Sequence, residues 1–170
     1  RIEGVGFSYP SGGPSVLIDI DAQLQVGERV AVVGPNGAGK TTLLKLLCRF
    51  YDPSVGRITL DGTDLTAFDP VALRTRIAGV FQDFVRYDLT VSENIRLGRQ
   101  ADDSVTDDEV RAAAEAVGVH ERVSALPEGY ATRLGRRFDK GRELSIGEWQ
   151  KIALARAWLR DAPVLFLDEP

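Results

Sequence analysis

Residues 34–41 read Gly34-Pro35-Asn36-Gly37-Ala38-Gly39-Lys40-Thr41, which is the pattern G-x-x-x-x-G-K-[ST]. An apolar, strand-like stretch, Val30 to Val33, comes before it, and a helix-like stretch, Thr42 to Phe50, comes after it. A strand, a glycine-containing loop and a helix in this order are the context that identifies a phosphate-binding loop. The segment therefore predicts a site for a nucleoside triphosphate.

The residue types in this loop suit a bound phosphate. Glycines let backbone N–H groups converge on phosphate oxygens, and the dipole of the helix that follows, near Thr42, adds positive potential. Lys40 supplies a point charge, and the hydroxyl of Thr41 can ligate Mg²⁺. We expect the phosphates of the nucleoside triphosphate to be held by the whole run, that is, by Gly34, Pro35, Asn36, Gly37, Ala38, Gly39, Lys40, Thr41 and Thr42.

Composition fits one ordinary domain of 170 residues, with 44% hydrophobic residues and a net charge of -4. No apolar run approaches the roughly 18 residues of a membrane span, and no basic block points to nucleic acid. The single cysteine, Cys48, lies in an apolar stretch and is expected to be buried. Because the chain contains no methionine and stops directly after an apolar stretch, we expect it to be a segment of a longer protein, with weak stability on its own.

The pattern along the chain predicts an α/β fold. Loose alternation in residues 1–9 and 16–24, and a hairpin turn at Asp61-Gly62, indicate antiparallel strands. The continuous apolar runs 77–81 and 164–167 are typical of parallel strands buried on both faces. Residues 83–144 have helical character, including a capping box that begins at Thr106 and a helix stop at Gly118.

Polar residues at the ends of the two apolar runs are candidates for chemistry. Asp168 follows 164–167 and could hold Mg²⁺ through water, while Glu169 could orient the attacking water as the catalytic residue. Gln82 follows 77–81. Ser145 and Glu148 form an S-x-x-E capping box, which is either a well-started helix or a phosphate grip at a helix N-terminus. Spacing alone does not choose between these two.

The order of phosphate loop, Gln82, Leu144-Ser145-Ile146-Gly147-Glu148 and Leu167-Asp168-Glu169-Pro170 resembles the nucleotide-binding domain of an ATP-binding cassette (ABC) transporter of the exporter type. The resemblance implies a three-layer P-loop NTPase core with an antiparallel β-subdomain and a helical insertion. It divides the chain into a nucleotide-binding core with β-subdomain, 1–82 and 145–170, and a helical subdomain with the approach to the signature, 83–144.

The resemblance also implies site residues. Tyr9 and Val16 would contact adenine, and Gln82 would join Thr41 and Asp168 around Mg²⁺. Ser145, Gly147 and Glu148 would form the signature that acts in trans on ATP held by a second ABC ATPase domain, in a homodimer or heterodimer. Ile146 and Glu148 depart from the common Leu-Ser-Gly-Gly-Gln.

Other features of the family concern contacts with the transmembrane domain and with the second subunit. The stretch 83–95 is similar to the surface that receives a coupling helix from the transmembrane domain, and 133–141 to a loop that senses the other subunit. The implied location is thus the cytoplasmic face of a membrane, and the implied function is ATP hydrolysis that powers export.

The resemblance leaves other readings open. The loop and the switch histidine that the family places after the catalytic carboxylate do not occur in these 170 residues, so we expect poor turnover from this segment alone. His120 is expected to be a surface residue. Two alternatives to an exporter remain at this point: a soluble ABC ATPase, and a nucleotide-dependent dimerisation module that does not hydrolyse ATP.

Overall fold

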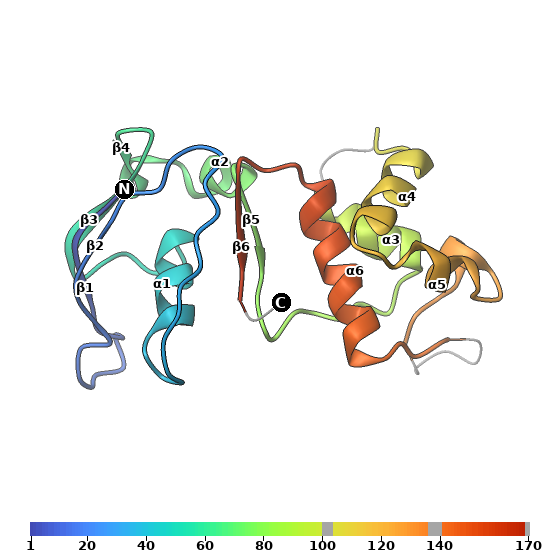
Figure 1. Ribbon diagram of the computed structural model, residues 1–170, viewed down its shortest axis with the longest axis horizontal. Coiled ribbons are helices and arrows are strands. Elements are labelled where there is room, and N and C mark those ends of the chain that lie inside the picture. The colour runs from blue at the N-terminus through green and yellow to red at the C-terminus, as the bar shows by residue number, and fades with distance from the viewer. Residues whose placement is uncertain (100–103, 136–140, 169–170) are drawn as a thin grey trace. The chain divides into compact units, whose positions relative to one another are not determined.

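The computed structural model describes residues 1–99, 104–135 and 141–168. The chain forms two compact units, residues 1–77 and 78–170, each considered by itself below (Figure 1). The first unit is a small antiparallel sheet with two helices, and the second is mainly helical. No helix among the described residues combines the length and apolar character needed to cross a bilayer.

The first unit contains the antiparallel sheet that the sequence predicted. Its strands lie in the order β2-β1-β3-β4, and the pairs Val5 with Ile20 and Ile2 with Ile58 fix the register around the central strand. Asp61 and Gly62 connect the last two strands with φ angles of 51° and 80°, as a tight hairpin with two left-handed residues requires. The strands are β1 (Ile2–Phe7), β2 (Leu17–Ala22), β3 (Val55–Leu60) and β4 (Thr63–Asp64).

Two helices complete this unit. Helix α1 (Lys40–Leu47) follows the glycine-containing loop, and Leu46 on it is buried. Helix α2 (Pro70–Thr75) begins where Asp69 accepts hydrogen bonds from the N–H groups of Val71 and Ala72, after the short 3₁₀ helix η1 (Leu65–Ala67). Cys48, which caps the end of α1, is buried as expected, and burial raises the pKa of its thiol to about 11.

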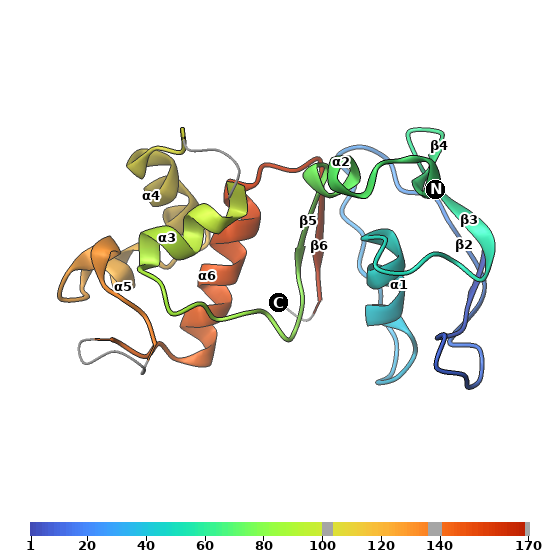
Figure 2. The same ribbon diagram turned by 180° about the vertical axis from the view of Figure 1, so that it is seen from behind.

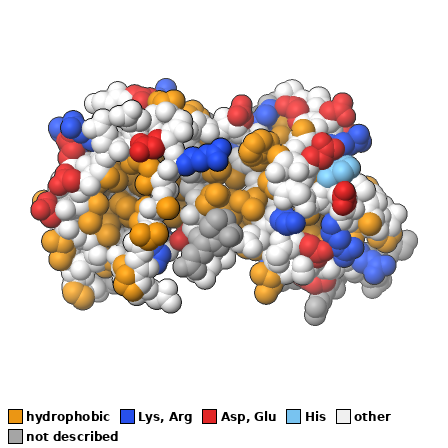
Figure 3. All heavy atoms as spheres, viewed as in Figure 1, with side chains coloured by type: hydrophobic (Ala, Val, Ile, Leu, Met, Phe, Trp, Pro, Cys, Tyr) orange, Lys and Arg blue, Asp and Glu red, His pale blue; other side chains and the backbone are white. Residues whose placement is uncertain are grey.

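The strand expected at Val30 to Val33 is absent from this unit. The segment is irregular, and Val30, Val32 and Val33 are 53%, 50% and 87% exposed. An extended segment becomes a strand only when a neighbour takes up its backbone N–H and C=O groups, and none of the four strands of the first unit pairs with this one. Figure 3 shows hydrophobic side chains on the surface of this unit.

The second unit contains the two apolar strands. Strand β5 (Ile77–Val80) pairs with β6 (Val164–Leu167), and Figure 1 shows the two running in the same direction. Ala153 and Ala157 cover one face by packing on Ala78 and Val80. The expectation of burial on both faces is wrong for β6 in this structure, because Leu165 and Leu167 are 46% and 40% exposed on the other face.

The helices of this unit share one hydrophobic core. Trp149, Ile152 and Leu159 project from α6 into a cluster with residues such as Ile95 of α3 and Val110 of α4, and Figures 1 and 2 both show α3 and α4 beside α6. The elements are α3 (Val91–Arg96), η2 (Leu97–Arg99), α4 (Asp107–Ala116), α5 (His120–Ser124), η3 (Gly129–Ala131) and α6 (Ile146–Leu159). Helix α6 shares this core and therefore belongs to the same compact unit as residues 83–144. The predicted division of the chain into a nucleotide-binding core (1–82 and 145–170) and a helical subdomain (83–144) stays a prediction.

Local signals at the helix ends are confirmed. Thr106 and Glu109 form the predicted capping box at the start of α4, and Gly118 follows the helix with a φ of 68°. His120 was expected on the surface but is only partly exposed, since its Nδ1 lies 2.8 Å from the hydroxyl of Tyr130. The ring of Tyr130 packs on the core of the second unit, and this hydrogen bond holds the imidazole against it.

Candidate functional site

The glycine-containing loop has the backbone shape of a phosphate cradle. Gly37 and Gly39 have φ angles of 80° and 91°, which side-chain-bearing residues rarely adopt, and Gly39 forms the N-cap of α1. A methyl group at Gly39 would lie 2.8 Å from Cδ2 of Leu17 and 3.2 Å from the carbonyl oxygen of Val16. Both the conformation and the packing therefore require glycine at position 39.

Positive charge gathers at this loop. The ammonium group of Lys40 donates to the carbonyl oxygens of Gly34 at 2.9 Å and Pro35 at 3.1 Å, so its side chain bends back over the loop. The first N–H groups of α1 have no acceptor within the helix and carry the positive end of its dipole. The hydroxyl-bearing Thr41 is exposed in this first turn. Such a group of donors suits a polyphosphate.

The residues predicted to contact adenine lie beside the loop. The hydroxyl groups of Tyr9 and buried Thr42 are 3.0 Å apart, and Val16 contacts the position of Gly39. The ring of Tyr9 also makes edge contacts with Phe7 and Tyr51, at centroid distances of 5.0 and 5.3 Å. Four of the predicted residues, Tyr9, Val16, Gly39 and Thr42, thus lie together in the first unit. The hydroxyl group of Thr42 is already within hydrogen-bond distance of the Tyr9 hydroxyl.

The second unit carries Gln82 and Asp168, two of the three residues predicted around Mg²⁺; the third, Thr41, lies in the first unit. Gln82 and Asp168 follow β5 and β6 at the same end of this two-stranded sheet, and the backbone N–H of Asp168 donates to the carbonyl oxygen of Val80 at 2.9 Å. Asp168 is 7% exposed, and its Oδ2 has no hydrogen-bond partner among the described residues. A buried carboxylate oxygen without a protein donor is chemically suited to a divalent cation. Glu169 lies outside the described residues.

The predicted signature forms the start of α6. The hydroxyl oxygen of Ser145 accepts the N–H of Glu148 at 3.3 Å, and the carboxylate of Glu148 accepts the N–H of Ser145 at 2.7 Å. That hydrogen bond and the guanidinium of Arg122, which donates to the same carboxylate, lower the pKa of Glu148. Ile146 is 69% exposed, and a methyl group at Gly147 would meet no atom within 4 Å. Nothing in the packing of this unit therefore requires glycine at 147.

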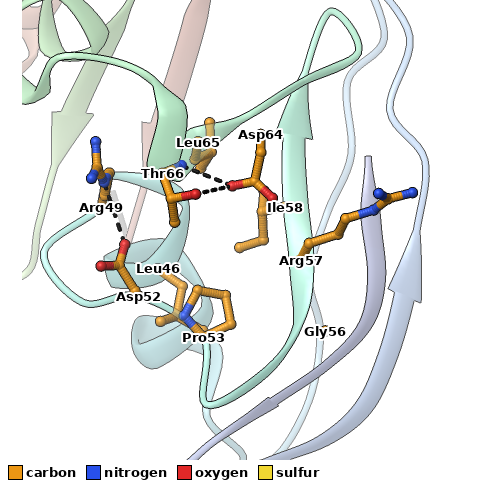
Figure 4. Close-up of a pocket in the computed structure, with 10 residues that line it drawn as sticks. All are labelled: Leu46, Arg49, Asp52, Pro53, Gly56, Arg57, Ile58, Asp64, Leu65 and Thr66. Carbon is orange, nitrogen blue, oxygen red and sulfur yellow. Dashed lines mark hydrogen bonds and ion pairs between the residues drawn. The ribbon is translucent and has the colours of Figure 1, made fainter.

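A separate cavity of about 190 Å³ lies in the first unit, between the end of α1 and the strands β3 and β4 (Figure 4). Its charged side chains already have partners within the unit. Arg49 donates to the carbonyl oxygen of Phe68 at 2.5 Å and to Asp52 at 3.3 Å, and Asp64 accepts from Thr66. None of the predicted site residues lines this cavity, so it is distinct from the phosphate loop.

Three polar residues that make notable side-chain hydrogen bonds were not identified from the sequence. Arg122, which pairs with Glu148, is 26 residues away from it and belongs to no local pattern. Asn94 and Arg156 have a detectable signal, because each falls on the buried stripe of its helix. Asn94 lies between buried Val91 and Ile95, and Arg156 follows Trp149 and Ile152 at helical spacing.

Comparisons with known proteins agree with the motifs. A family model described as ABC transporter matches residues 17–170. The chain is 46% identical over 167 residues to the β-(1→2)glucan export ATP-binding/permease protein NdvA of Brucella suis biovar 1 (strain 1330), covering 98% of this chain and 27% of that protein. It is 44% identical over 169 residues to ATP-binding cassette sub-family B member 6 of Homo sapiens, covering 99% of this chain and 19% of that protein.

A solved structure is similar as well. It is described as a bacterial Atm1-family ABC exporter with ATP bound, and it matches with a TM-score of 0.88 and 38% identity over 99% of this chain and 28% of that one. The chain thus spans about a fifth to just over a quarter of the length of these relatives. The fold is that of an ABC ATPase, a P-loop NTPase with an antiparallel β-subdomain, and two of the three similar proteins named above are described as exporters or export proteins. The chain therefore belongs to the ABC transporter family, within whose ATP-binding domain it falls.

Proposed function

We propose that this chain binds ATP, and that the whole protein to which it belongs hydrolyses ATP and thereby powers export across a membrane. The observation that carries the proposal is the loop at Gly39 and Lys40, where a left-handed glycine, a lysine ammonium and the free N–H groups of α1 converge. Family membership supplies the nucleotide class, since ABC ATPases bind ATP. Hydrolysis, dimerisation and transport are proposals for the whole protein to which the chain belongs.

Two groups of site residues act at the phosphates, one holding the phosphate oxygens and the other Mg²⁺. Lys40 and the backbone N–H groups of residues 34–42 hold the phosphate oxygens and keep them in one geometry. Thr41, Gln82 and Asp168 would hold Mg²⁺, which when bound neutralises phosphate charge. The unpartnered Oδ2 of Asp168 supports this assignment.

The remaining residues contact the attacking water and the adenine ring. Glu169 orients the attacking water and accepts its proton. Tyr9 and Val16 form one side of the adenine site, where the tyrosine ring offers an apolar face. The hydrogen bond between the hydroxyl groups of Tyr9 and Thr42 supports this placement, because it ties the ring to the helix that begins at the phosphate loop.

The signature acts on ATP held by a second ABC domain. Because the hydroxyl oxygen of Ser145 accepts a backbone N–H, its own proton is free to be donated to a phosphate oxygen. Gly147 leaves open space beside it through which a phosphate can approach the backbone closely. ATP would then stabilise the closed dimer, and hydrolysis would release it.

The membrane part of the proposal rests on the relatives. The name of the Brucella relative describes a fused ATP-binding and permease protein, which supports a transmembrane domain as the second partner and a place at the cytoplasmic face of a membrane. Residues 83–95 would receive that domain. The exposed side chains of Val85 and Tyr87, at 55% and 42%, support an apolar contact there.

Calorimetry on the complete protein tests the nucleotide site. Lys40→Ala should weaken Mg-ATP binding by about 10 to 100-fold, since hydrogen bonds to charged groups contribute roughly 1.5 to 3 kcal/mol. Lys45→Ala, on the same helix but outside the loop, is the matched control and should bind as the parent does. Equal affinity of the Lys40 variant would refute the assignment of the loop.

Turnover tests the catalytic part. Glu169→Gln keeps the size and hydrogen bonding of the side chain but removes the base, so steady ATP hydrolysis should fall by about 100-fold or more while ATP still binds. Hydrolysis that continues at the parent rate would show that another group activates the water. An absence of hydrolysis in the parent itself would favour a nucleotide-dependent dimerisation module.

A further inference from the structure

Arg156 lies in the second half of α6 and is surrounded by the segment that follows Gln82. Its Nε donates to the carbonyl oxygen of Asn94 at 2.9 Å, its Nη1 to that of Val85 at 2.6 Å, and its Nη2 to the side-chain oxygen of Asn94. The guanidinium also lies 5.0 Å from the ring centre of Tyr87. Burial lowers the pKa of Arg156 to about 10, so the side chain stays charged at neutral pH.

Asn94 continues the same network from α3. Its side chain is fully buried, and its Nδ2 donates to the carbonyl oxygens of Tyr87 at 3.1 Å, Leu89 at 3.2 Å and Thr90 at 3.0 Å. These two side chains therefore bond five backbone carbonyl oxygens within residues 85–94, whose first part, before α3, has no helix or strand of its own. A buried network of this kind favours a single arrangement, because each lost partner leaves an unpaired polar group.

Neighbouring contacts join α6 to η2, the short 3₁₀ helix that follows α3. Arg160 donates to the carbonyl oxygen of Gly98 at 3.2 Å, and Arg99 donates to that of Leu159 at 2.6 Å. Gly98 itself packs directly on the backbone of Arg156. The two chain segments thus meet through backbone and charged side chains, which tolerate little sliding.

We propose that Arg156 and Asn94 are a positioning pair that makes residues 85–94 move together with α6. The inference rests on the proposed function, in which residues 83–95 receive the transmembrane domain and the start of α6 contacts ATP of the second subunit. Helix α6 has 14 residues and is about 21 Å long at 1.5 Å per residue. A shift imposed on residues 85–94 is therefore carried along a rigid helix to Ser145 and Gly147.

Hydrogen exchange on the complete protein tests this coupling. In a Glu169→Gln background, Mg-ATP should slow amide exchange in three places: the phosphate loop, the first turn of α6 and residues 85–94. Adding Arg156→Ala should leave the first two responses intact and reduce the response of residues 85–94 from about tenfold to less than about twofold. Arg156→Lys keeps the charge but not the planar fork, so it should restore only part of the response.

Arg96→Ala is the matched control. Arg96 also makes several hydrogen bonds, to Ser92 at 3.1 Å, to the carbonyl oxygen of Val105 and to Asp107 at 2.5 Å, but these do not join α3 to α6. This variant should keep the ATP response of residues 85–94. A role for Arg96 in the coupling would make the network less specific than we propose and would overturn the assignment to Arg156 and Asn94.

Each way in which the proposal can fail gives a different pattern of amide exchange. If Arg156→Ala or Arg156→Lys accelerates exchange in residues 85–94 but leaves their full response to ATP, the pair is merely structural and the proposal is overturned. The proposal also fails if these residues do not respond to ATP in the background protein. If instead Mg-ATP slows no exchange even at the phosphate loop, the proposed nucleotide function is what fails.

Discussion

Replacing Gly98 with alanine should loosen the contact between η2 and α6. A methyl carbon there would lie 3.0 Å from the carbonyl carbon of Arg156 and 3.3 Å from its Cα, and closer still to the carbonyl oxygen. Ordinary contacts begin near 3.4 Å, and the obstacle is helix backbone, which cannot rotate aside as a side chain can. Overpacking of this kind costs about 1 to 3 kcal/mol, and we expect the upper end.

Amide exchange in the last turns of α6 measures this cost. About 3 kcal/mol corresponds to roughly 150-fold faster exchange if the amides exchange by opening of this contact. The control is Gly147→Ala, whose methyl group meets no atom within 4 Å. It should be neutral, or stabilise the helix by about 0.5 to 1 kcal/mol. Exchange in the Gly98 variant within about threefold of the parent would refute the packing argument.

Three further outcomes follow from single residues. Cys48, with its pKa raised to about 11, should react with thiol reagents at pH 8 far more slowly than a free cysteine, and a stoichiometric reaction of folded protein would contradict its burial. Thr106→Ala should destabilise α4 by about 1 kcal/mol through loss of the cap, measured as faster exchange in that helix, whereas Thr106→Ser should not. Because hydrogen bonds lower the pKa of Glu148 below its usual 4.5, its contribution to stability is present above that pH and lost as the pH falls through the lowered value. The Glu148→Gln variant should lose this part of the acid dependence in a denaturation series, and an unchanged profile would contradict the assignment.

Features set by a few neighbouring residues could be predicted from the sequence. The phosphate loop, the hairpin at Asp61-Gly62 and the capping boxes at Thr106 and Ser145 each depend on residues no more than eight positions apart. Their backbone geometry follows from glycine's tolerance of positive φ and from side-chain oxygens that bond nearby N–H groups. Gln82, Ser145 and Asp168 accordingly lie at the ends of the elements that were expected to present them.

Features that depend on distant partners could not be predicted in this way. Val30 to Val33 have the composition of a strand, but pairing requires a neighbour that local composition does not specify. Arg156 and Asn94 are 62 positions apart, and the sequence near either residue does not indicate that the two are hydrogen-bond partners. What the sequence does offer is a polar residue on an otherwise apolar helix stripe, which indicates a buried partner without identifying it.

The open space at Gly147 has a practical consequence for protein engineering. The longest helix of the chain keeps, in its first turn, a residue that weakens helices, although its own fold would accept a larger one there. A screen that selects variants for heat resistance alone would therefore favour alanine at this position. If the second subunit's nucleotide needs that space, as we propose, such a screen would enrich well-folded variants that have lost the proposed contact with ATP.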